Sequence, residues 1–168
     1  MAESTATTEP QPKESRPTPA PATPARRDWQ LWAVLMALLA VMYALVWSPY
    51  WQMGGSDDAY YLSIARSVAR GQGLRWQGQL VTDVPPLWPK MLAAVMQISG
   101  GSMAAINALC ALLTLSAAGV WYWVLRRFAR PALAFASILV AALLYRWFCN
   151  AIHAYSEGLF CLLLGAAV

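Results

Sequence analysis

Two long apolar runs constrain this chain more than any other feature. The first, from Leu31 to Trp47, reads LWAVLMALLAVMYALVW and contains no charged residue. The second extends from Met103 to Leu125 and is also uncharged. Because a helix rises about 1.5 Å per residue, roughly 20 residues cross a hydrocarbon core that is about 30 Å thick. Both runs are therefore predicted to be transmembrane helices.

The composition agrees with a membrane environment. Of the 168 residues, 59% are hydrophobic and 12% are charged, whereas a soluble domain carries about 25% charged residues. So few charges leave too little polar surface for a water-soluble globule. We therefore expect an all-α, polytopic membrane protein with the lipid bilayer as its main partner. The net charge of +4 does not indicate a nucleic-acid partner, because the basic residues form no stripe with interleaved aromatic residues.

The chain divides into a hydrophilic tail and a membrane domain. Residues 1–28 are rich in Pro, Thr, Ala and Glu and lack helical or strand periodicity, so they are predicted to be a disordered cytoplasmic tail. Residues 29–168 form the membrane domain. A span that stops within the bilayer leaves carbonyl groups unpaired, so we expect the protein to continue beyond its last apolar run. The predicted spans are about 29–50, 103–125 and 131–147, with an incomplete span from residue 158.

Arginines beside the spans predict the orientation. Arg26 and Arg27 precede the first span, which places the N-terminus in the cytoplasm by the positive-inside rule. The apolar segment 85–99 begins with prolines and is too short to span, and a crossing there would put a later arginine cluster outside. We therefore predict a short interfacial helix at 85–99 within an external loop over residues 51–102. The cluster that then lies in the cytoplasm is Arg126, Arg127 and Arg130.

The external loop is predicted to begin with an amphipathic helix over residues 57–70. An apolar stripe at helical spacing is typical of a helix that lies on a membrane surface. The stripe comprises Tyr61, Ile64, Ala65 and Val68.

Two adjacent acids, Asp57 and Asp58, occupy the first turn of this helix. One interpretation is structural, because carboxylates there cap free N–H groups and complement the helix dipole. The other is functional. Adjacent helical residues point about 100° apart, so under this interpretation one acid faces a cavity while the other caps the helix or acts as a ligand. Glu157 has the same two interpretations, since an acid at the start of an apolar helix either caps it or faces a cavity.

The order of these features resembles the N-terminal module of GT-C glycosyltransferases. The similarity is to the protein O-mannosyltransferase and aminoarabinose transferase group, and it covers residues 29–168. The features are a first span, the acidic pair followed by Tyr61, the sequence Pro85-Pro86-Leu87-Trp88, a span ending in Arg126-Arg127-Phe128, and Glu157 before the next apolar run.

The resemblance implies a large inverting enzyme in the plasma membrane, which is the inner membrane of a bacterium. Such an enzyme moves a sugar from a polyprenyl-phosphate donor to an acceptor at the external face, and the acceptor is unknown. By the same resemblance Asp57 is the catalytic base with Asp58 beside it, and Tyr61 and Glu157 contact the substrate.

A basic residue is expected to meet the donor phosphate. Family members often carry Lys directly before the Pro-Pro pair, where this chain has Val84. Lys90 and Arg66 are the candidates to replace it. No cofactor is predicted and no metal ligand is assigned, although a divalent metal is compatible with glycosyl transfer. The alternative to an enzyme is a non-catalytic multi-span membrane protein, either part of a transporter or a truncated remnant.

Overall fold

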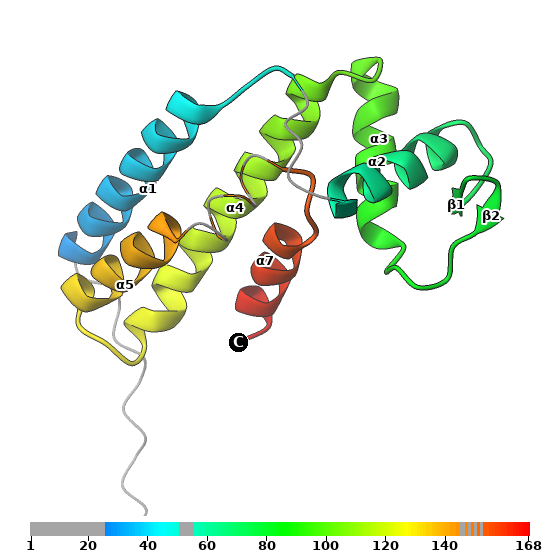
Figure 1. Ribbon diagram of the computed structural model, residues 1–168. Helices are drawn as coiled ribbons and strands as arrows, with labels where there is room; N and C mark the ends of the chain where they lie inside the picture. The colour runs from blue at the N-terminus through cyan, green and yellow to red at the C-terminus, as the bar shows by residue number, and fades with distance from the viewer. Residues whose placement is uncertain (1–25, 51–55, 145–146, 148, 150, 152) are drawn as a thin grey trace, which may run out of the picture.

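The computed structural model describes residues 26–50, 56–144, 147, 149, 151 and 153–168. This part of the chain is mostly helical, as the sequence predicted (Figure 1). Most of the predicted tail lies outside the described residues, but residues 26–28 form the first turn of a helix. The elements are α1 (Arg26–Val46), α2 (Ser56–Ala69), β1 (Arg75–Trp76), β2 (Gln79–Leu80), α3 (Leu87–Ser99), α4 (Met103–Arg126), α5 (Pro131–Leu143) and α7 (Glu157–Ala167).

Within the described residues, α1 and α4 are the helices that are long and apolar enough to cross a membrane. They overlap the spans predicted at 29–50 and 103–125. The apolar helices α5 and α7 are shorter, and α5 ends at Leu143 although the predicted span continued to residue 147. The segment 85–99 forms a short helix, as predicted, which follows Pro86 directly.

Helices α1 and α4 run antiparallel, and polar contacts join them at both ends (Figure 1). At one end, the guanidinium of Arg126 donates to the Asp28 carboxylate at 2.7 Å, and the Tyr122 hydroxyl donates to the Asp28 carbonyl at 3.1 Å. At the other end, the Asn107 amide donates to the carbonyl of Ser48 at 2.8 Å. The start of α1 therefore lies beside the end of α4.

One hydrophobic core joins α1, α4 and α5. Leu35 and Leu39 of α1 are fully buried against Tyr122 of α4 and against the small side chains of Ala134 and Ala142 on α5. Helices pack closely where one partner presents small residues, because the backbones then approach each other. This core explains why α5, although short, lies along both longer helices (Figure 1).

Helix α7 packs on the side of α4 away from α1 (Figure 1). Two glycines make this contact. A Cβ atom at Gly158 would lie 3.0 Å from Thr114 Oγ1, and one at Gly165 would lie 3.0 Å from Val120 Cγ1. Both distances are shorter than ordinary Cβ contacts, so a larger residue at either position would require the neighbouring side chain to shift, and glycine favours the close approach of the two helices.

Helices α2 and α3 form a second packed unit beside α4. Leu62 and Ala65 of α2 share a core with Leu92 of α3 and Ile106 of α4. The apolar stripe predicted on α2 is thus largely covered by protein, and Ile64 and Ala65 have no exposed surface. Helical periodicity reports that one face is apolar, but it does not tell whether lipid or another helix covers that face.

A two-stranded hairpin, β1–β2, was not expected from the sequence. Gln77 and Gly78 form its turn with φ angles of 50° and 83°, and Arg75 pairs with Leu80. Positive φ at both central residues is the geometry of a type I′ turn, in which glycine is favoured.

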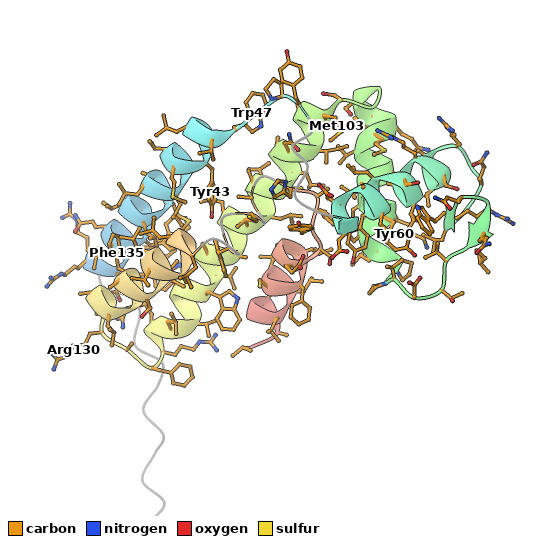
Figure 2. The ribbon with its side chains drawn as sticks, in the orientation of Figure 1. Tyr43, Trp47, Tyr60, Met103, Arg130 and Phe135 are labelled. Carbon is orange, nitrogen blue, oxygen red and sulfur yellow. The ribbon has the colours of Figure 1, made fainter. Side chains whose placement is uncertain are left out.

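The side chain of Tyr60 ties α2 to this hairpin (Figure 2). Its ring lies 5.1 Å from the ring of Trp76, edge to face. Its hydroxyl donates to Asp83 Oδ1 at 3.1 Å, and slight desolvation together with the Asp83 carboxylate raises the pKa of Tyr60. Asp83 is therefore hydrogen-bonded to Tyr60, on the side of α2 that faces the hairpin.

Candidate active site

The two acids at the start of α2 have different environments. Asp57 is exposed, whereas Asp58 has no exposed surface. Asp58 Oδ1 accepts the backbone N–H of Ala59 at 2.8 Å, so this carboxylate satisfies a donor at the helix start, where the dipole also favours negative charge. The two adjacent carboxylates therefore differ in environment: Asp58 is buried and supports the helix start, whereas Asp57 is exposed.

The loop that precedes α7 packs against the first turns of α2 and α3. The Tyr61 hydroxyl of α2 lies 3.5 Å from the Ser156 hydroxyl. The indole N–H of Trp88, on α3, donates to the carbonyl of Ala154 at 3.0 Å in a buried position. These contacts bring together segments that are more than 60 residues apart in the chain.

Tyr155 lies within this loop, close to three acids. Burial raises the pKa of Tyr155 above its ordinary value of 10.0, and the charges of Asp58, Asp57 and Glu157 raise it further. Each of these carboxylates disfavours a second negative charge on the phenol. The contact between Tyr61 and Ser156 brings the start of α7 beside α2, and the raised pKa of Tyr155 agrees with carboxylates of both helices in its surroundings.

Glu157 lies level with the middle of α4 and not at its end. Glu157 directly precedes Gly158, which contacts Thr114. Thr114 is about 16 Å along the helix axis from Met103, the first residue of α4. Glu157 is thus held beside an apolar helix, on its α7 side.

Two of the predicted substrate-binding residues are not part of this group. Arg66 is about 12 Å further along the axis of α2 than Asp58, and it is exposed. Lys90 is exposed on α3. Across the part of the chain that the structure describes, no hydrogen bond or ion pair joins either side chain to the acids. Among the described residues, Tyr61 therefore lies beside Ser156, which directly precedes Glu157, whereas no such contact joins the two basic candidates to the acids.

Tyr155, Ser156 and Trp88 take part in the site, but sequence reasoning did not select the first two. Tyr155 stands in a short segment with no periodicity, and only its position two residues before Glu157 could have drawn attention to it. Trp88 belongs to the Pro85-Pro86-Leu87-Trp88 motif, and its buried indole holds the α7 loop in place.

The arrangement is suited to proton transfer from a hydroxyl. Asp57 presents an exposed carboxylate, the type of group that takes a proton from a hydroxyl. Burial and the nearby carboxylates raise the pKa of Tyr155 above its ordinary value, so this phenol is a hydrogen-bond donor at neutral pH. Among the described residues, no group of three or more His, Cys, Asp or Glu side chains could hold a metal ion, so no step is assigned to a metal.

Comparisons with known proteins add no family to this description. No protein-family model, curated protein or solved structure matches the chain.

Proposed function

We propose that this protein is a polytopic membrane protein with a cytoplasmic N-terminus. The length and apolar composition of α1 and α4 support two crossings. Their antiparallel arrangement brings Arg26 and Arg27, at the start of α1, to the same end as Arg126 at the end of α4. Arg130 lies at this end as well, opposite Trp47 and Met103 (Figure 2). Arginines directly beside the ends of both candidate spans fit the positive-inside rule, which counts basic residues close to the span ends.

The same ion pair supports an interfacial position for α3. If α3 crossed the bilayer, α1 and α4 would enter it from the same side and run parallel. The start of α1 would then lie far from the end of α4, and Asp28 would not reach Arg126, to which it is bonded at 2.7 Å. The proposed external region is therefore the unit formed by α2, the hairpin and α3.

The proposed activity is glycosyl transfer from a polyprenyl-phosphate sugar to an acceptor hydroxyl at the external face. The observation that carries it is the exposed carboxylate of Asp57 in one site with Asp58, Tyr155 and Glu157. The resemblance to GT-C enzymes supplies the donor class, since an acidic pair at the start of the first external helix holds the base in that family. The sequence and the site together support the enzyme over a structural role.

The proposed reaction is a single displacement. Asp57 takes the proton from the acceptor hydroxyl while the acceptor oxygen forms a bond to the anomeric carbon of the sugar. The bond from that carbon to the phosphate oxygen breaks, and its electron pair leaves with the lipid phosphate. A phosphate is a good leaving group without protonation, so one base is sufficient, in contrast to the two carboxylates of glycoside hydrolases. Asp58 is a positioning residue that holds the start of α2.

An Asp57→Asn variant tests this proposal. The amide preserves the volume and still accepts hydrogen bonds, but it does not take a proton, so transfer should fall by about 10²–10⁴-fold. The measurement is sugar transfer from a polyprenyl-phosphate donor by the full gene product in nanodiscs, with the melting temperature recorded alongside. Asp83→Asn is the matched control, because Asp83 is also an exposed acid of the same unit and contacts Tyr60 instead. Full transfer by the Asp57 variant would refute the proposed base.

A transport role is the alternative function. The position of Glu157 beside the middle of α4, a candidate span, favours it. Acids beside the middle of a candidate span are typical of ion and substrate pathways. In that case Asp57→Asn and Glu157→Gln should both abolish uptake into proteoliposomes, and the wild-type protein should catalyse no sugar transfer.

A further inference from the structure

A polar pocket lies at the opposite end of α2 from the acids, between this helix and the hairpin. Its volume is about 300 Å³. The lining is almost entirely polar and is dominated by three arginines from two elements. Its main lining residues are Arg66, Ser67 and Arg70 of α2, Gln72 of the following turn, and Arg75 and Gln77 of the hairpin.

The positive charge of this pocket is uncompensated. No acidic residue lines it, and across the described residues the one salt bridge is the distant pair of Arg126 and Asp28. The three arginines are exposed, so water weakens their mutual repulsion, but three positive charges around one pocket still attract an anion. An anion of matching geometry would relieve this repulsion and accept several charge-assisted hydrogen bonds.

A purely structural role does not account for all three arginines. Cations near the last turn of a helix complement the dipole, which explains Arg66 and Arg70 on α2. Arg75 belongs to a different element, and its position is fixed by the hairpin. Its Nη1 donates to the carbonyl of Gly78 at 2.8 Å across the turn, which holds the guanidinium over the pocket that both residues line.

The side chain of Ser67 is the second, independent observation. Ser67 lines the pocket and is 9% exposed, and its hydroxyl is closed to solvent and has no hydrogen-bond partner among the described residues. A buried hydroxyl without a partner costs free energy, and rotation of this short side chain toward a ligand oxygen in the pocket would remove the cost. The buried donor and the arginines thus point to the same kind of ligand.

We propose that this pocket binds a phosphate group through Arg66, Arg70, Arg75 and the Ser67 hydroxyl. Guanidinium forks match the geometry of phosphate oxygens and bind them in pairs, whereas a hydroxyl supplies one further donor. The phosphate comes either from a soluble phosphate compound or from the headgroup of an anionic lipid. This site is separate from Asp57, and the inference does not rest on the proposed glycosyl transfer.

The test measures binding directly with the full chain. Inorganic pyrophosphate is titrated into the detergent-purified protein and followed by calorimetry. In parallel, the protein is placed in phosphatidylglycerol and in phosphatidylcholine nanodiscs, and retained lipid is counted by native mass spectrometry. The variants are Ser67→Ala and the double variant Arg70→Gln/Arg75→Gln. Arg130→Gln, an exposed arginine at the far end of the bundle, is the matched control.

Each outcome of these measurements either supports or refutes phosphate binding in this pocket. We expect pyrophosphate or phosphatidylglycerol to bind and the double arginine variant to weaken binding by about tenfold or more, since several charge-assisted bonds are lost. Ser67→Ala should weaken it less, and Arg130→Gln should leave it unchanged. Binding of pyrophosphate identifies a soluble ligand, whereas retention of phosphatidylglycerol alone identifies a headgroup. Absence of both, or equal loss in the Arg130→Gln control, refutes the site. Melting temperatures verify that every variant remains folded.

Discussion

At the scale of single residues, the candidate site depends on the different environments of two adjacent acids. Asp57 and Asp58 are adjacent, yet one is exposed and the other is fully buried. Helical geometry causes this division, because successive side chains point about 100° apart. Tyr155 is the residue at which the charges of the acidic pair and of Glu157 combine.

The titration of Tyr155 tests this grouping. Burial is the largest cause of its raised pKa, and Asp58 is the largest contributor among the charges. We therefore expect Asp58→Asn to lower the pKa of Tyr155 more than Glu157→Gln does, with both values still above 10.0. Carbon-13 NMR of labelled tyrosines measures it, and Tyr155→Phe assigns the signal. Since the folded pKa exceeds the unfolded one, the contribution of this group to stability is present below pH 10 and declines as the pH rises through the folded pKa. If neither variant changes the pKa of Tyr155, these acids do not lie close enough to influence its hydroxyl.

At the scale of helices, the contact between the ends of α1 and α4 fixes their relative direction. The Asp28 side chain is 5% exposed and the Arg126 side chain is 22% exposed, so the pair is screened from solvent on one side only. The carbonyl of Ala129 is a second acceptor for the Arg126 guanidinium. Removing one charge from such a pair leaves the other in a poorly solvated position.

An Arg126→Gln variant should therefore be destabilised, by about 2 kcal/mol, because the Asp28 carboxylate loses its charged partner. The double variant Asp28→Asn/Arg126→Gln should recover part of this loss, since it leaves no unpaired charge. Unfolding in mixed detergent measures all three free energies as a double-mutant cycle. Arg127→Gln is the control, because Arg127 is exposed and contacts only the carbonyl of Val168 in the described structure. Additive effects at Asp28 and Arg126 would contradict a coupled pair.

At the scale of the whole molecule, the chain consists of a helical bundle and a smaller unit of α2, α3 and the hairpin (Figure 1). The arginine-rich end of the bundle lies away from this unit. If the bundle spans a membrane in the proposed direction, the hairpin is external and the loop between α4 and α5 is cytoplasmic.

Cysteine labelling of intact cells tests this orientation. Cys110, Cys149 and Cys161 are first replaced by alanine, and single cysteines are then introduced at Gln77, in the hairpin turn, and at Arg130, before α5. An impermeant maleimide should label Gln77→Cys in intact cells and Arg130→Cys only after permeabilisation. The reverse pattern would overturn the proposed orientation, and labelling of both in intact cells would exclude two membrane crossings by α1 and α4.

Local sequence patterns were sufficient for the helices themselves. The apolar runs predicted α1 and α4, the Pro85-Pro86 pair predicted the start of α3, and the first-turn acids predicted the start of α2. Each of these signals acts within a few turns of the chain, so it is visible without knowledge of the fold. The hairpin was missed because Gln-Gly is a weaker turn signal than Asn-Gly and its strands have two residues each.

Only the tertiary structure decided which residues meet. The approach of Tyr155 to Asp57 and Asp58, the burial of the α2 stripe under α3, and the pairing of Asp28 with Arg126 all join residues distant in sequence. Such contacts arise from the packing of whole helices. They leave no local periodic pattern in the sequence from which they could be predicted. For the same reason Arg66 joined a pocket with Arg75 and Ser67 and not the acids that the sequence had associated with it.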